Sequence, residues 1–132
     1  AGRVKHEDLA YYYAAADICV VPSHYEPFGL VAIEAMASRT PVVASNVGGL
    51  KFSIDNYKTG LLVPPQDEVA FAQGIDSILA DDQWRQELGE NARQRVEDKF
   101  SWKGVATQLD NQYMVELNKL WVELGLLASA AV

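Results

Sequence analysis

Short runs of apolar residues alternate along the chain with longer segments in which apolar residues recur at helical spacing. Three runs are continuous and end at proline or polar residues, and they cover about 18–21, 41–44 and 60–63. A continuous apolar run of this length is typical of a strand that is buried on both faces, as the strands of parallel sheets are. The runs therefore predict three parallel strands.

Helical patterns precede, separate and follow these strands. Segments 7–16 and 30–37 predict short helices, and 67–79 and 84–96 predict two longer ones with an apolar stripe. A long C-terminal helix is expected to begin with Ser101 as its N-cap and to continue to about Leu124. Strands that alternate with helices predict an α/β domain built on a parallel sheet. The sequence contains no internal repeat or linker, so a single domain is expected.

The composition narrows the class of protein. A chain of 132 residues, with 49% hydrophobic and 22% charged residues, suits one globular domain rather than a disordered segment. Its 11 basic and 18 acidic residues give a net charge of −7. This balance argues against broad binding to nucleic acid or to anionic membranes, both of which require a basic surface. A local anion site remains compatible with it.

The expected location is the cytoplasm. Charged residues crowd positions 3–8, which is unlike a signal peptide, and no apolar run approaches the ~18 residues that would suggest a membrane span. The single cysteine, Cys19, lies within an apolar run and has no partner for an internal disulfide. We interpret it as a small core residue in a reducing compartment.

A strand is expected to end and a helix to begin within residues 23–30, whose sequence is Ser-His-Tyr-Glu-Pro-Phe-Gly-Leu. Ligands of parallel α/β sheets bind at the carboxyl ends of the strands, and helix N-termini attract anions through their unpaired amides. Gly29 carries no side chain that would keep an anion from the backbone. These features together predict an anion site at Phe28 to Leu30.

Two glutamates flank this site. Glu26 precedes the helix and is expected to point into the crevice, and Glu34 lies one turn inside, leaning back toward the same opening. The helix around Glu34 is apolar on almost every side, so its carboxylate needs a partner. Hydroxyls of a ribose diol would suit an acceptor-only carboxylate. Alternatively, Glu34 pairs with a backbone amide or a basic side chain, and Glu26 is simply solvated.

An ordered series of short motifs covers most of the chain. It begins with Glu-Pro-Phe-Gly-Leu at 26–30 and Glu34, with seven residues between the two glutamates, followed by Ala-Met-Ala at 35–37. It continues with Thr-Pro-Val-Val-Ala-Ser at 40–45, Gly48-Gly49 and Thr-Gly-Leu-Leu-Val-Pro at 59–64. This series resembles the retaining glycosyltransferases with two facing Rossmann-like domains (the GT-B type), glycosyltransferase family 4. That family includes sucrose-phosphate synthases, glycogen synthases and many mannosyltransferases.

The resemblance implies a role for each matching residue. Glu26 would hold hydroxyls of the donor sugar near the reacting centre, as the catalytic residue, and Glu34 would take the ribose hydroxyls of the nucleotide. The backbone amides of Phe28, Gly29 and Leu30 would contact the sugar and the diphosphate. Val4 matches a loop position where the backbone meets the nucleobase.

The resemblance also implies the reaction. A hexosyl group, expected to be glucosyl, would pass from a nucleoside diphosphate sugar to a hydroxyl acceptor with retained configuration. Neither a cofactor nor a metal is expected. Nothing in the spacing of His6 and His24 suggests metal ligands, and both are interpreted as ordinary loop residues.

By the same resemblance, residues 1–132 are part of the C-terminal nucleotide-sugar-binding domain. They correspond to the second half of a Rossmann-like sheet whose strand order is 3-2-1-4-5-6. The acceptor pocket and the basic clamp on the diphosphate would lie on parts of the family's fold that the chain does not match, so the chain alone is expected to be inactive. The strand at 18–21 would be an open edge, through which the fragment is expected to self-associate.

Two departures from the family pattern are visible. Arg39 stands where the family usually has a glycine after the helix, at an expected cost of about 1 kcal/mol for a left-handed cap. Leu50-Lys51-Phe52 follow Gly48-Gly49, where a glutamate is common, and this variant resembles the sucrose-phosphate-synthase branch. Two alternatives to an enzyme remain open: a non-catalytic nucleotide-binding module and a structural oligomerisation module.

Overall fold

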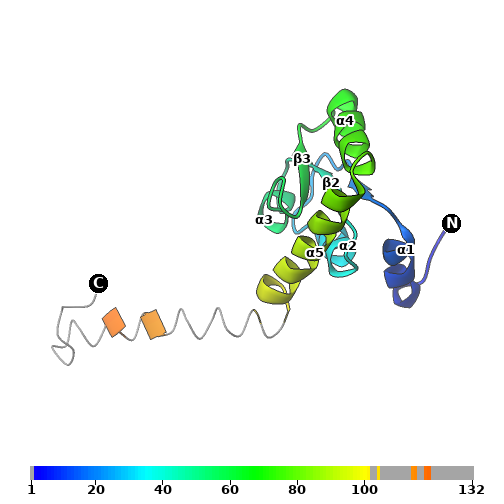
Figure 1. Ribbon diagram of the computed structural model, residues 1–132. Helices are drawn as coiled ribbons and strands as arrows, with labels where there is room; N and C mark the ends of the chain where they lie inside the picture. The colour runs from blue at the N-terminus through cyan, green and yellow to red at the C-terminus, as the bar shows by residue number, and fades with distance from the viewer. Residues whose placement is uncertain (1, 102–103, 105–113, 116–117, 120–132) are drawn as a thin grey trace. The chain divides into compact units, whose positions relative to one another are not determined.

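The computed structural model describes residues 2–101, 104, 114–115 and 118–119. The chain divides into two compact units, residues 1–96 and residues 97–132. The elements that carry the argument belong to the first unit (Figure 1). In chain order, they are η1 His6–Asp8, α1 Leu9–Ala15, β1 Cys19–Val21, α2 Leu30–Ala37, β2 Val42–Ser45, α3 Leu50–Ser53, β3 Gly60–Val63, α4 Glu68–Leu79 and α5 Asp82–Lys99, whose last turn enters the second unit.

The three described strands form one parallel sheet in the order β1-β2-β3. Val43 lies at its centre, paired with Val20 of β1 on one side and Leu61 of β3 on the other. The sheet confirms the predicted α/β class. Strand β3 has the predicted bounds, whereas β1 and β2 each begin one residue later than predicted. Pro41 lacks the amide that could join the ladder, but its carbonyl oxygen accepts from the Cys19 amide at 2.9 Å.

Successive residues of the strands contribute to two hydrophobic clusters, one on each face of the sheet. The first cluster packs β1 and β2 against α2 and α3, and its fully buried members include Met36, Val42 and Leu50. The second packs Val43 and β3 against α4, where Ile78 is fully buried. Helix α5 contributes Leu88 to the second cluster and Ala92 to the first. Burial on both faces explains why the strands are continuously apolar.

The helices follow the sequence where local signals are strong. Helix α2 has the predicted bounds, and α4 begins after Asp67, whose side chain accepts from the Ala70 amide at 2.9 Å. The helix expected over 7–16 is instead the 3₁₀ turn η1 followed by α1. Helix α3 has only four residues, was not predicted, and follows Gly48-Gly49 directly.

The second unit is described only in part. The side chain of Ser101 accepts a hydrogen bond from the Gly104 amide at 3.0 Å, as an N-cap does. Most of the long helix expected from there to Leu124 lies outside the described residues.

Arg39 adopts the left-handed backbone conformation expected after α2, with φ at 61°. Its guanidinium Nε lies 2.9 Å from a carboxylate oxygen of Glu90 on α5, and both side chains are well exposed. An exposed ion pair of this kind contributes about 0–1 kcal/mol. It therefore offsets only part of the strain that a glycine would avoid.

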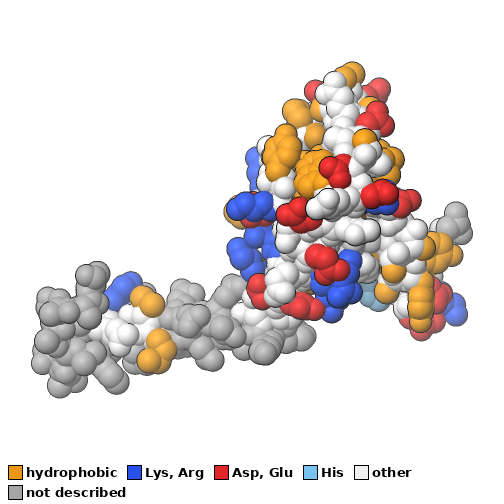
Figure 2. Space-filling view, in the orientation of Figure 1, with side chains coloured by type: hydrophobic (Ala, Val, Ile, Leu, Met, Phe, Trp, Pro, Cys, Tyr) orange, Lys and Arg blue, Asp and Glu red, His pale blue; other side chains and the backbone are white. Residues whose placement is uncertain are grey.

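Charged side chains of both signs are visible over the described part of the face shown in Figure 2. Hydrophobic side chains gather over α1, where Tyr11 is 76% and Tyr12 is 52% exposed. Cys19 is partly buried and packs against the first cluster, consistent with its interpretation as a core residue. Burial raises the pKa of its thiol.

Candidate functional site

The loop from Glu26 to Gly29 leads from β1 into α2, and the carboxylate of Glu26 folds back onto it. Oxygen Oε1 of Glu26 accepts hydrogen bonds from the amides of Gly29 at 3.0 Å and Phe28 at 3.4 Å. Gly29 itself provides no side-chain cap. The carboxylate of Glu26 thus caps the N-terminus of α2, and the ligand anion site expected at Phe28 to Leu30 stays a prediction.

We call the N-terminus of α2 with residues 26–30 the mouth of α2. Part of this mouth remains available for a ligand. Oxygen Oε2 of Glu26 makes no hydrogen bond with any residue that the structure describes, nor does the amide of Leu30, the first residue of α2. The side chains of Phe28 and Leu30 are 73% and 62% exposed beside them. The mouth therefore presents an acceptor and a donor that the described residues leave without a hydrogen-bond partner.

Gly29 serves the fold in a way that the sequence argument did not anticipate. Its φ of 75° lies in the left-handed region that favours glycine. A Cβ at this position would meet Oγ of Ser53 at 3.1 Å and Cδ2 of Leu50 at 3.3 Å. The space beside Gly29 is thus filled by α3, so the absence of a side chain lets α3 pack against the loop.

The Gly48-Gly49 pair packs directly against the backbone of the loop that carries Glu26. The amide of Gly49 donates to the carbonyl oxygen of Glu26 at 2.7 Å. A Cβ on Gly49 would lie 2.5 Å from the carbonyl oxygen of Pro27, and one on Gly48 would lie 2.2 Å from that of Glu26. Two backbones approach here so closely that neither glycine can carry a side chain without displacing the loop.

Helix α3 and Arg95 complete this support. The Ser53 hydroxyl donates to the carbonyl oxygen of Gly49 at 3.1 Å and lies 3.4 Å from that of Phe28. Arg95 of α5 donates from Nε to the carbonyl oxygen of Ser53 at 2.7 Å and from Nη2 to that of Phe52 at 2.8 Å. A cation at the C-terminus of a helix offsets the partial negative charge of its carbonyls. Arg95 thus stabilises the turn that supports Glu26.

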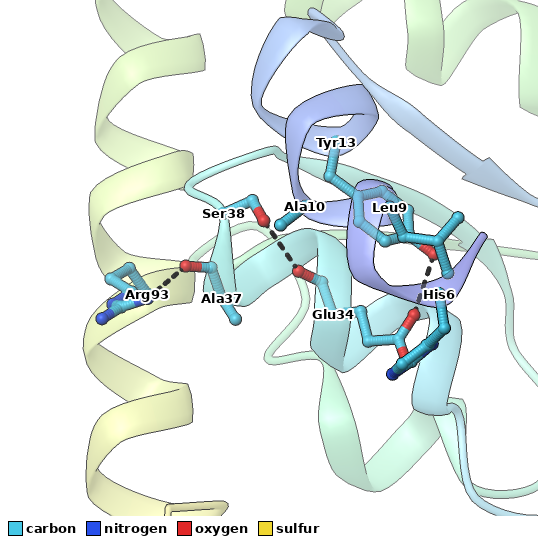
Figure 3. Close-up of a pocket in the computed structure, with 8 residues that line it drawn as sticks. All are labelled: His6, Leu9, Ala10, Tyr13, Glu34, Ala37, Ser38 and Arg93. Atoms are coloured by element: carbon cyan, nitrogen blue, oxygen red, sulfur yellow. Dashed lines mark hydrogen bonds between the residues drawn. The ribbon is translucent and has the colours of Figure 1, made fainter. Parts of the chain in front are cut away.

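Glu34 is half-buried on the face of α2 that meets α1. Its Oε2 accepts a hydrogen bond from the hydroxyl of Tyr13 at 3.1 Å (Figure 3). The sequence left open a backbone amide, a basic side chain or a ligand as its partner, and the structure supplies a phenol. Helix α2 is also less enclosed than its composition suggests, because Val31 is 44% exposed.

A cavity of about 290 Å³ opens beside Glu34, between α1, α2 and α5. Figure 3 shows Arg93 of α5 at its far wall, donating to the carbonyl oxygen of Ala37 at the end of α2. The residues that line it are His6, Leu9, Ala10, Tyr13, Glu34, Ala37, Ser38 and Arg93. Apolar walls with a few convergent polar groups are typical of a small-molecule site.

The surroundings of Tyr13 in the cavity wall displace its titration. Burial, followed by its hydrogen bond to the Glu34 carboxylate and the charge of that carboxylate, raises the pKa of Tyr13 to about 12. The phenol therefore stays protonated at neutral pH and acts as the hydrogen-bond donor in the pair.

The structure brings some of the predicted site residues together and separates others. Glu26, Phe28, Gly29 and Leu30 share the mouth of α2, whereas Glu34 faces the cavity. Val4 is partly buried just before η1 and is not among the residues that line the cavity.

Of the residues that line the cavity, the sequence singled out only Glu34 as a site residue. His6, interpreted as an ordinary loop residue, and Tyr13 both line the cavity with Glu34. No motif near either residue indicates that it shares a cavity with Glu34, because packing brings them together from distant parts of the chain. Tyr13 and Glu34, for example, are 21 positions apart.

No helix in the described part of the chain has the length and apolar character needed to cross a membrane. Among the same residues, no group of three or more His, Cys, Asp or Glu is arranged to hold a metal ion.

Comparison with known proteins places this arrangement in a family. Residues 1–95 match the family described as glycosyl transferases group 1. The glycogen synthase of Mycobacterium tuberculosis is 42% identical over 113 residues, which are 86% of this chain and 27% of that protein. The chain thus spans little more than a quarter of this relative's length.

Solved structures show the same likeness. The sucrose-phosphate synthase of Thermosynechococcus elongatus is 55% identical with a TM-score of 0.78, over 90% of this chain and 30% of that one. The structure of Anabaena HepE in complex with UDP-glucose is 26% identical with a TM-score of 0.67, over 79% of this chain and 29% of that one.

Proposed function

The chain belongs to the glycosyl transferases group 1 family, whose fold here is of the GT-B type, and from this premise we propose that it forms the donor-binding wall of a retaining glycosyltransferase. The enzyme would transfer a hexosyl group, glucosyl in our proposal, from a nucleoside diphosphate sugar to a hydroxyl acceptor. The likeness to sucrose-phosphate synthase and to a protein solved with UDP-glucose supports a glucosyl donor. We place the reaction in the cytoplasm and propose that it uses neither metal nor cofactor.

The observation that carries this proposal is the hydrogen bonding of the two carboxylates. Glu26 and Glu34 each have one oxygen held by the chain, the first by the Gly29 amide and the second by the Tyr13 hydroxyl. The other oxygen of each is left to accept from hydroxyl groups of a ligand. Two carboxylates fixed in this way at one helix suit a polyhydroxylated substrate, because an ionised carboxylate only accepts hydrogen bonds.

Each residue then has a proposed role. Glu26 holds hydroxyls of the donor sugar beside the reacting bond, and Glu34 binds the ribose. The amides at Phe28, Gly29 and Leu30 contact the sugar and the diphosphate, and the Leu30 amide is available for this without rearrangement. For the Phe28 and Gly29 amides to bind phosphate, Oε1 of Glu26 would first have to leave them. The backbone at Val4 meets the nucleobase.

Turnover by the full-length gene product tests the proposal. Incubated with UDP-, ADP- or GDP-sugars and candidate acceptors, it should release nucleoside diphosphate. Glu26→Gln should lower kcat/KM by at least about tenfold, since a hydrogen bond to a charged acceptor is replaced by a weaker neutral one. The same change at the exposed Glu87 on α5 is the matched control and should have no effect.

Other results would separate the alternatives. Unchanged turnover in Glu26→Gln would remove the assignment of that residue. Nucleotide binding without transfer under any donor would favour a non-catalytic nucleotide-binding module, and the absence of binding would favour an oligomerisation module. The isolated 132-residue chain should be inactive, because the acceptor pocket and the diphosphate clamp are proposed to lie on another part of the enzyme.

We also propose that the isolated chain self-associates through β1. This strand is at the edge of the described sheet, and Val20 on it is 41% exposed. The opposite edge is partly covered, because the Asn56 side chain accepts from the Leu62 amide of β3 at 2.9 Å. Exposed apolar edges tend to pair with a second copy.

Light scattering tests this self-association. The mass of the isolated chain should rise with concentration, and Val20→Lys should keep the chain monomeric. A wild-type monomer at high concentration would contradict the proposal.

A further inference from the structure

The contact between Tyr13 and Glu34 joins two helices that are distant in sequence. The Tyr13 hydroxyl donates to Oε2 of Glu34 at 3.1 Å across 21 positions. The carbonyl oxygen of Tyr13 accepts from the Thr40 hydroxyl at 2.6 Å, which ties α1 to the segment that follows α2. The Tyr13 side chain also packs against the first hydrophobic cluster. The phenol therefore has a fixed place from which to direct the carboxylate.

We propose that Tyr13 is a positioning residue: its hydroxyl holds Oε2 of Glu34 so that Oε1 is directed to the ribose diol of the donor nucleotide. The inference rests on the proposed function, because it takes Glu34 as the ribose-binding group. Tyr13 itself is not proposed to touch the substrate. It acts by selecting one orientation of a side chain that otherwise has several.

The chemistry of the two groups favours this role. A glutamate side chain loses rotamer freedom when it binds a ligand, and a partner that fixes it beforehand reduces that loss. A ribose diol offers two donors, whereas a carboxylate offers only acceptors. The phenol, with its pKa raised to about 12, remains a donor at neutral pH and does not repel the carboxylate as a phenolate would.

The arrangement has a selective consequence. Only the nucleotide hydroxyls gain from the orientation of Glu34, so its benefit disappears for a nucleotide that lacks them. In this proposal, the contact serves the nucleotide equally in the ground state and in the transition state. Its loss should therefore raise KM and leave kcat largely unchanged.

The experiment measures binding by calorimetry in the full-length gene product, with UDP, ADP and GDP and the 2′,3′-dideoxy form of each. Tyr13→Phe removes only the hydroxyl and retains the ring. For the nucleotide that binds best, we expect affinity to fall by about five- to tenfold. Affinity for its dideoxy form should stay within about twofold of the wild type. In turnover, KM for the nucleotide sugar should rise by a similar factor.

Tyr12→Phe, the same change on an exposed neighbour, is the matched control and should alter neither affinity. If Tyr13→Phe loses affinity equally for the ribose form and the dideoxy form, its role is merely structural and the inference is overturned. An unchanged affinity for the ribose form would overturn it too. If the wild type binds the ribose and dideoxy forms equally, Glu34 does not bind the diol and its proposed role fails first. If Glu34→Gln alone loses ribose selectivity and Tyr13→Phe retains it, Glu34 keeps its role and only the positioning by Tyr13 fails.

Discussion

Replacing Gly49 with alanine should lower the free energy of unfolding by about 3 kcal/mol and should also abolish measurable sugar transfer by the full-length enzyme. The added Cβ would lie 2.5 Å from the carbonyl oxygen of Pro27 and 2.7 Å from the carbonyl carbon of Phe28. Both are backbone atoms, so no flexible side chain can move aside. The loop that carries Glu26 has to shift, and the hydrogen bond from the Gly49 amide to the Glu26 carbonyl oxygen is lost with it.

Urea unfolding of the 132-residue chain measures the first effect, and nucleoside diphosphate release by the full-length gene product measures the second. Gly74→Ala is the matched control. A Cβ on Gly74 would meet its nearest neighbours, Leu61 and Val43, at 3.4 Å, which is ordinary contact. Alanine in the interior of α4 should then be neutral or stabilise by up to about 1 kcal/mol. If Gly49→Ala is as stable and active as the wild type, Gly49 does not support the site as we describe.

Replacing Gly89 with alanine should lower the free energy of unfolding by about 2 kcal/mol or more and affect sugar transfer less than Gly49→Ala does. A Cβ on Gly89 would lie 2.3 Å from the carbonyl oxygen of Arg39. Arg39 holds a left-handed conformation, and the next amide, of Thr40, donates to the carbonyl oxygen of Ala35 at 3.0 Å. The Arg39 peptide therefore cannot turn away easily, and α5 has to move off α2. Alanine's better helix propensity, worth about 1 kcal/mol, offsets only part of this cost.

The two glycine variants together separate stability from function. Under conditions where both remain folded, Gly89→Ala should lose less kcat/KM than Gly49→Ala, because its Cβ meets the carbonyl oxygen of Arg39 and not the loop that carries Glu26. Gly49→Ala should lose activity even when folded. Equal losses of activity in the two variants at matched stability would contradict the role assigned to Gly49. The stability difference is measured by urea unfolding and the activity by nucleoside diphosphate release.

The mouth of α2 shows how far local sequence reaches. A strand that ends just before Pro22, a glycine before the helix and a glutamate three residues ahead of that glycine all act within a few positions of each other. Their effects on backbone conformation and hydrogen bonding are local, so the sequence places the helix correctly. It does not reveal that Glu26 caps the mouth itself. The same local sequence is compatible with a Glu26 carboxylate directed to solvent and with one that folds onto nearby amides.

The residues that support this segment from elsewhere in the chain cannot be identified from local sequence. Gly48 and Gly49 stand out in the sequence only as part of a family pattern, and their physical role depends on the approach of the β2–α3 loop to the backbone of 26–28. Likewise, Arg95 reaches the carbonyl oxygen of Ser53 across 42 positions. Such contacts depend on how helices cross a sheet, and no periodicity along the chain records that geometry.

The sequence by itself determined the α/β class, the three strands, the bounds of α2 and the pair of glutamates, because burial pattern, capping and turn chemistry are set by neighbours along the chain. Only the tertiary structure decided that Tyr13 holds Glu34, that His6 faces the same cavity and that two glycines support Glu26. Each of these depends on atoms brought within a few ångströms by packing between elements far apart in the chain. The side chains that carry the proposed chemistry are therefore visible in the sequence, whereas the groups that orient them are not.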